Sequence, residues 1–148
     1  MTINRQPDKT DWRIINILSE QYVSNSAIAR ELELSEGAIR QRIKKLQNDG
    51  ILKIRALRDP EILKNQQLGI ITANVTESSL MKDKAAEICG LNGVLSVSII
   101  SGRYDLWIEV LVSSNKGLIT FLTEELSKIK GISKTETFLT LKSYQKYV

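Results

Sequence analysis

The sequence predicts an α+β protein with two domains, a helical domain followed by a mixed domain of strands and helices. Two patterns predict this division. The N-terminal third carries apolar residues at helical spacing, whereas the remainder alternates between strand-like and helix-like periodicity. The dipeptide Asp59-Pro60 marks the boundary, because the residue before a proline is disfavoured in helical geometry. We expect domains at 1–58 and 68–148, joined by a polar linker at 59–67.

Composition excludes several classes of protein. Of the 148 residues, 42% are apolar and 26% are charged, which is the balance of a folded chain. No apolar run approaches the roughly 20 residues of a membrane span, and no secretory leader is recognisable. A lone cysteine, Cys89, excludes an intramolecular disulfide, so we expect a cytoplasmic location and no membrane partner. Because the chain has no histidine and no phosphate-binding glycine loop, we expect neither an enzyme nor a metal or other cofactor.

Three amphipathic helices are expected in the N-terminal domain. Each is marked by apolar residues three or four positions apart, and serines stand where two of them begin. The expected bounds are Asp11 to about Glu20, a Ser24 or Ser26 cap before the apolar Ile28, Ala29 and Leu32, and a Ser35 cap to about Asn48. Gly50 follows the third helix, and glycine readily takes the left-handed conformation that ends helices.

The third helix carries the strongest functional signal. Ile39, Ile43 and Leu46 form its apolar stripe, while the opposite face offers amide, ammonium and guanidinium groups. In a major groove, arginine favours guanine, and glutamine or asparagine favours adenine. The residues expected to face bases are Gly37, Arg40, Gln41, Lys44 and Asn48. Those expected to contact phosphates are Ser35, Arg42, Lys45, Lys53 and Arg55.

A basic ribbon is expected after this helix. Residues 51–58 alternate apolar with basic side chains, a pattern typical of a short strand or wing. Eleven of the 21 Lys+Arg residues and seven of the 17 Asp+Glu residues lie at or before Arg58, so this third of the chain carries the whole net charge of +4. That asymmetry favours a polyanionic partner such as double-stranded DNA. The alternative is a solvated basic face on a helical module that contacts other proteins.

The C-terminal domain shows the order strand, helix, strand, strand, helix, strand. Strands are expected at 68–75, 94–100, 106–112 and 135–141; one helix follows a cap at Ser78 or Ser79, and the other runs from about Asn115 to Gly131. This order predicts a ferredoxin-like βαββαβ sheet with both helices on one face. Cys89 falls on the apolar stripe of its helix, so we expect it to be buried.

The sheet face without helices is expected to be apolar. In 106–112 and in the last strand, alternation places Trp107, Leu111 and Phe138 opposite the core. An exposed apolar patch of this kind is rare in monomers. We therefore expect a homodimer packed sheet to sheet.

Short motifs follow one another along the chain in a recognisable order. They are Asp8, Asp11 and Ile15-x-x-Leu18, then Ile28-Ala29-Arg30-Glu31-Leu32-Glu33-Leu34-Ser35, then Ile39, Arg42-Ile43 and Leu46, and then Gly50-Ile51-Leu52. In this order they resemble the winged helix-turn-helix of the Lrp/AsnC, or feast/famine, transcription regulators. The C-terminal half is similar to the ligand-responsive (RAM-type) domain of that family. The resemblance implies a sequence-specific DNA-binding regulator that pairs sheet to sheet and can build octamers.

The resemblance also implies an effector site. The turn Gly102-Arg103-Tyr104-Asp105 is similar to the family's effector loop, and Thr135 and Thr137 match the Thr-x-Thr of its last strand. An amino-acid effector would pair its ammonium group with Asp105 and its carboxylate with Arg103. A plain hairpin turn is the structural alternative. Two other functions stay open: a metabolite-sensing ferredoxin-like module acting through protein partners, and a small enzyme, which lacks any candidate acid–base pair.

Overall fold

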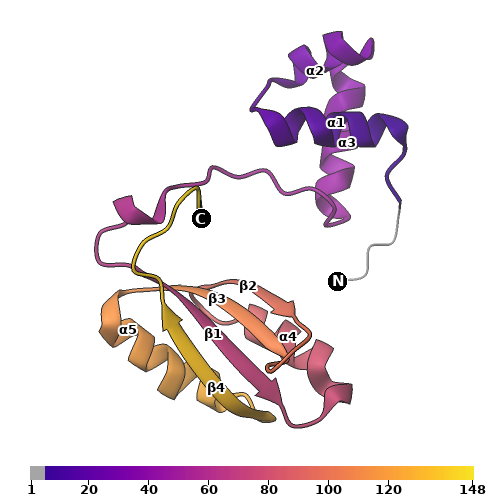
Figure 1. Ribbon diagram of the computed structural model, residues 1–148. Helices are drawn as coiled ribbons and strands as arrows, with labels where there is room; N and C mark the ends of the chain where they lie inside the picture. The colour runs from indigo at the N-terminus through magenta and orange to yellow at the C-terminus, as the bar shows by residue number, and fades with distance from the viewer. Residues whose placement is uncertain (1–5) are drawn as a thin grey trace. The chain divides into compact units, whose positions relative to one another are not determined.

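The computed structural model describes residues 6–148, so the first five residues of the expected N-terminal domain lie outside the described residues (Figure 1). The chain divides into two compact units between Ala56 and Leu57. Each unit is described by itself.

The N-terminal unit contains three helices, α1 (Lys9–Glu20), α2 (Asn25–Leu32) and α3 (Glu36–Asn48). Serine caps begin the last two, because the Ser24 and Ser35 hydroxyls accept the backbone N–H of the third residue on. A core of six buried residues joins the helices: Ile14, Ile28, Ala29, Leu32, Ile39 and Ile43.

After α3, the expected glycine cap is confirmed but the expected strand is not. Gly50 has the expected left-handed conformation, with φ of 69°. The strand expected over residues 51–58 is absent, and this segment runs in extended form without a ladder. A strand needs a neighbour to take its backbone hydrogen bonds, and the three helices supply none. Leu52 is the part of the segment that packs against the helical core.

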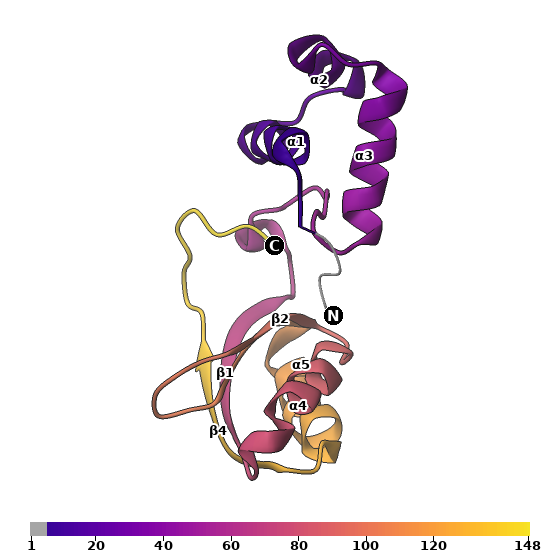
Figure 2. The ribbon, with the colours of Figure 1, turned by 90° about the vertical axis from the view of Figure 1, so that its right-hand side faces the viewer.

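The C-terminal unit is a four-stranded antiparallel sheet in the order β2-β3-β1-β4 (Figure 1). Its elements are β1 (Gln67–Val75), α4 (Met81–Cys89), β2 (Val94–Ile99), β3 (Leu106–Val112), α5 (Ser114–Thr120) and β4 (Ile132–Leu139). Figure 2 shows α4 and α5 on the same side of the sheet. The expected ferredoxin-like fold is confirmed.

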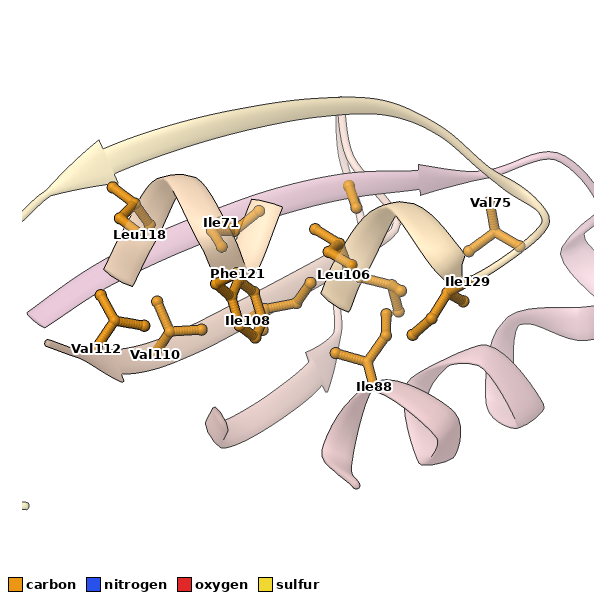
Figure 3. Packing of buried hydrophobic residues seen from close by; sticks show 12 residues of the cluster. Ile71, Val75, Ile88, Leu106, Ile108, Val110, Val112, Leu118, Phe121 and Ile129 are labelled. Carbon is orange, nitrogen blue, oxygen red and sulfur yellow. The ribbon is translucent and has the colours of Figure 1, made fainter. Parts of the chain in front are cut away.

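The core of this unit lies between the sheet and the two helices. Alternate residues of β1 and β3 face the helices, and Ile71 stands opposite Ile108 in the register. Figure 3 shows Phe121 packed beside Ile108, with Ile88 contributed by α4. Full burial of these side chains contributes about 1.5–3 kcal/mol each.

Local details of this unit correct several expectations. Neither Ser78 nor Ser79 caps α4, because a 3-10 turn at Ser78–Leu80 leads into the helix without a side-chain cap. Cys89, the last residue of α4, is exposed rather than buried. The second helix was expected to be α-helical throughout. Only its first part is, as α5 up to Thr120; one π-helical turn and one 3-10 turn follow.

The sheet face without helices carries aromatic residues, as alternation predicted. Trp107 is 37% exposed and Phe138 is 45% exposed, while Leu111 is half-buried. Leu141 was expected in the last strand, but β4 ends at Leu139 and Leu141 is 96% exposed. Beyond β4 the chain turns back, and Val148 exchanges two backbone hydrogen bonds with Arg58, at 2.8 and 2.9 Å.

Candidate nucleic-acid interface

Helix α3 presents one apolar and one polar face. Ile39 and Leu46 are fully buried and Ile43 nearly so. The six predicted contact residues on the other face are all exposed: Gly37, Arg40, Gln41, Lys44, Lys45 and Asn48. Thirteen residues give the helix a length of about 20 Å, which spans a major groove. Figure 2 shows α3 along its whole length.

The centre of the polar face has no protein partner. Within the described part of the chain, the side chains of Gln41, Lys44 and Asn48 make no hydrogen bond or ion pair. Arg40 donates to the Glu36 carboxylate at 2.6 Å, but both side chains are exposed. An exposed pair of this type stabilises a helix by less than about 1 kcal/mol, so the Arg40 guanidinium can exchange partners at little cost.

The start of α3 combines a cap with an open backbone. Ser35 Oγ accepts the Ala38 N–H at 3.2 Å, so its hydroxyl is engaged in capping. A Cβ atom built on Gly37 would have no neighbour within 4 Å. The first N–H groups of a helix attract anions, and an absent side chain lets phosphate approach them closely.

Arg42 does not lie where sequence reasoning placed it. Its guanidinium donates to Asp8 Oδ2 at 2.7 Å and to Asp11 Oδ1 at 2.8 Å, both at the start of α1. Asp11 is fully buried and Arg42 is about one-third exposed. The expected role as a phosphate contact is therefore replaced by an internal ion pair that joins α3 to α1.

The aspartates of this pair also form a capping box. Asp8 accepts the Asp11 N–H at 2.8 Å, and Asp11 accepts the Asp8 N–H at 3.2 Å. The hydrogen bond from Arg42, with the Asp11 N–H bond, lowers the pKa of Asp8. Both carboxylates raise the pKa of Arg42. Sequence reasoning missed this role, although two aspartates three residues apart at a helix start were a visible signal.

Two further predicted residues follow the helix. Lys53 and Arg55 are exposed on the extended segment after Gly50. Neither side chain has an ion pair in the described part of the chain. Both ammonium and guanidinium groups are thus available to an anion.

The predicted effector turn is held by β1. Asp105 donates its N–H to the Ala73 carbonyl at 3.0 Å, and its Oδ2 accepts the Val75 N–H at 2.9 Å. These bonds hold the turn against the end of β1 on its β3 side, next to the residues where the register between β1 and β4 shifts. Gly102 has φ of 135°, which a side chain would disfavour.

Tyr104 is buried on the sheet face without helices. Its hydroxyl donates to the Glu136 carboxylate, and the cationic groups of Arg103 and Lys134 lie 5.7 and 5.8 Å from the ring centroid. The Glu136 hydrogen bond, with burial and the negative charge, raises the pKa of Tyr104 above its ordinary value.

The structure does not bring all six predicted effector residues together. Thr135 pairs with Ala73 and Thr137 with Ile71, so both threonines project on the helix-covered side of the sheet. Tyr104 and its partner Glu136 lie on the other side. Within one chain, Tyr104 and the two threonines therefore lie on opposite faces of the sheet.

In the part of the chain that the structure describes, no helix has both the length and the apolar content needed to cross a membrane.

Comparison with known proteins agrees with this geometry. Residues 7–53 match a model of winged helix-turn-helix DNA-binding domains, and residues 70–147 match the Lrp/AsnC ligand binding domain. An uncharacterized HTH-type transcriptional regulator of Pyrococcus furiosus is 36% identical over 88% of this chain and 88% of its own length. The HTH-type transcriptional regulator LysM of Saccharolobus solfataricus is 30% identical over 95% of this chain and 98% of its own.

A solved structure shares the fold. A transcriptional regulator of Neisseria meningitidis, crystallised in complex with L-Met, superposes with a TM-score of 0.69 at 22% identity, covering 95% of this chain and 94% of that one. The matched models span both units, and the named relatives are regulators rather than enzymes. The chain belongs to the Lrp/AsnC family of DNA-binding transcription regulators.

Proposed function

We propose that α3 is the recognition helix of this regulator and that Arg40, Gln41, Lys44 and Asn48 read base edges in a major groove. The observation that carries this proposal is the polar face of α3, which is exposed and has no protein partner at its centre. Because these side chains are exposed and unpaired at the centre of the face, their donors and acceptors are available to the edges of bases.

Phosphate contacts come from the groups around this helix. Lys45, Lys53 and Arg55 supply charge, and the start of α3 at Ser35 and Gly37 supplies backbone N–H groups. Arg42 supports the site indirectly, because its bonds to Asp8 and Asp11 fix α3 against α1.

Binding of Lys44→Glu to selected genomic fragments, measured by fluorescence anisotropy, tests this assignment. Because a reversed charge repels the DNA backbone and removes a base contact, we expect at least tenfold weaker binding. Lys116→Glu is the matched control, since Lys116 is an exposed lysine of α5 in the other unit. Equal losses in the two variants would refute the recognition role of α3.

The sheet face without helices is the proposed homodimer surface. It exposes Trp107 and Phe138 beside the half-buried Leu111, and burying such a patch is favourable. A two-fold dimer would present two copies of α3 to half-sites about 34 Å apart or a multiple of that distance. Sedimentation of Trp107→Lys should show monomer where the parent chain shows dimer; a monomeric parent chain contradicts the proposal.

An amino acid is the proposed effector. The Arg103 guanidinium would pair with its carboxylate, and Asp105 Oδ1, which accepts no hydrogen bond in the described chain, would accept from its ammonium group. Because Thr135 and Thr137 face the other side of the sheet, a second copy is needed to complete the site. The regulator of Neisseria meningitidis, crystallised with L-Met, supports this ligand class. Calorimetric titration with single amino acids tests it, and Arg103→Ala should abolish the heat of binding.

A further inference from the structure

A hollow of about 360 Å³ lies in the C-terminal unit where β3 passes into α5. It stands at the opposite end of β3 from the effector turn, because β3 begins at Leu106 beside that turn and ends at Val112 beside the hollow. A volume near the lower end of the range of ligand sites suits a small molecule. No residue proposed above for DNA or effector binding lines it.

The walls combine an apolar floor with polar groups and one charge. Phe121 and Val112 supply apolar surface on the helix-covered side of the sheet. The polar side chains that line the hollow are those of Gln66, Asn92, Ser113 and Thr120. Glu125 is the one charged residue among the lining residues, and no lining residue is cationic. The hollow therefore favours a ligand with a positive charge and an aliphatic part.

A π-helical turn brings Glu125 to this position. Residues Phe121–Glu125 form this turn, in which the usual hydrogen-bond spacing is lengthened by one residue. Two hydroxyl groups donate hydrogen bonds to backbone carbonyls around this turn. Thr123 donates to the Ile119 carbonyl at 2.8 Å, and Ser127 donates to the Thr123 carbonyl. These side-chain hydrogen bonds stabilise the π-helical turn, and such turns are frequent at functional sites.

The Glu125 carboxylate has no partner of its own. It is half-buried, and in residues 6–148 it accepts no hydrogen bond and makes no ion pair. An ammonium group in the hollow would give this carboxylate a charged hydrogen-bond partner. Its neighbour Glu124 is exposed and does not line the hollow.

Two glycines keep side chains away from the same space. A Cβ on Gly117 would lie 2.8 Å from Ser113 Oγ and displace that hydroxyl from the wall. Gly93 has φ of 85°, and a Cβ there would lie 2.9 Å from the Leu111 carbonyl oxygen. At both positions, any residue larger than glycine would force the neighbouring atoms of the wall to move.

From this arrangement we propose that the hollow binds a small organic amine, whose ammonium group pairs with Glu125 and whose aliphatic part packs on Phe121. An amino acid fits less well, because no lining cation would meet its carboxylate. The site is thus separate from the amino-acid site proposed at Arg103 and Asp105, and its failure would leave the DNA-binding proposal untouched.

Titration of the full chain with n-butylamine, followed by amide NMR shifts, tests the proposal. We expect saturable shifts at Gly93 and Gly117, with n-butanol and norleucine binding at least tenfold more weakly. The alcohol removes the charge and norleucine adds a carboxylate, so each isolates one element of the recognition. No saturable shift, or equal binding of the alcohol, would overturn the proposal.

Glu125→Gln and Glu124→Gln form the matched pair of variants. We expect at least tenfold weaker amine binding for the first and no change for the second, at unchanged far-ultraviolet circular dichroism. Equal effects of both would show general attraction of cations to this helix and overturn the site. If the Glu125 variant does not fold, the comparison of amine with alcohol on the parent chain decides.

Discussion

The Arg42 guanidinium and the Asp11 carboxylate are joined at 2.8 Å, and they connect the middle of α3 to the first turn of α1. Asp11 is fully buried, so its ion pair with Arg42 offsets part of the cost of that burial. The orientation of the polar face of α3 therefore depends on a residue that we do not expect to touch DNA.

Replacing Arg42 by Met should destabilise the N-terminal unit by about 3 kcal/mol, because it removes a hydrogen-bonded ion-pair partner of the fully buried Asp11. Amide hydrogen exchange in α1 and α3 measures this loss. The control is Arg40→Met, which breaks only an exposed pair and should change stability by less than about 0.5 kcal/mol. Similar losses of stability in both variants would mean that the buried ion pair contributes no more than the exposed one.

Acid should weaken the N-terminal unit through Asp8. Its folded pKa lies below the ordinary 3.8, so its stabilising effect is present above that pH and is lost as the pH falls through the folded pKa. Asp8→Asn lacks this dependence. The difference in unfolding free energy between parent and variant should therefore shrink as the pH is lowered from 5 to 3, to be followed by denaturant titration at each pH. A difference that does not change with pH would contradict this account.

Tyr104 should titrate above its ordinary pKa of 10.0, because its hydroxyl donates to Glu136 and is buried near that charge. Since the folded pKa is raised, the associated stabilisation is present below pH 10 and is lost as the pH rises through the folded value. In Glu136→Gln the pKa should fall toward 10.0, measured by NMR of labelled tyrosine rings. An unchanged pKa in the variant would show that Glu136 is not the cause.

Salt dependence should separate the two kinds of DNA contact. Lys45→Ala should reduce the slope of log affinity against log salt by about 0.9 for each copy bound, because one phosphate contact is lost. Gln41→Ala should leave that slope unchanged and weaken specific binding by about 1–3 kcal/mol. Fluorescence anisotropy over a salt series measures both, and identical slopes for Lys45→Ala and the parent chain would contradict the phosphate assignment.

Local signals in the sequence predicted most of the fold. Alternation identified which face of β3 is buried; Ser35 marked the start of one helix, and Ser24 or Ser26 that of another, where the structure has the cap at Ser24. These features depend on neighbours in the chain, so a sequence pattern is enough to show them. The exposure of the polar face of α3 was predictable for the same reason, because it follows from helical periodicity along the chain.

The failures concern partners that are distant in the chain. Arg42 looked like a phosphate contact because nothing local shows that Asp8 and Asp11 lie beside it. The ribbon at 51–58 has the alternation of a strand but no neighbouring strand to pair with. The π turn ending at Glu125 involves a change in hydrogen-bond spacing that apolar periodicity does not reveal. The contact residues for DNA, the effector site, the dimer and the cytoplasmic location stay predictions.

The two-way backbone pair between Arg58 and Val148 has a mechanical consequence. It ties the chain at Arg58 to the C-terminal end within the sheet unit, so the segment between the two units that is packed against neither is confined to the few residues after Leu52. In the dimer that we propose, so short a connection would limit how far apart the two copies of α3 can spread. Removing the hydrogen bonds between Arg58 and Val148 would then widen the range of half-site separations that the protein tolerates.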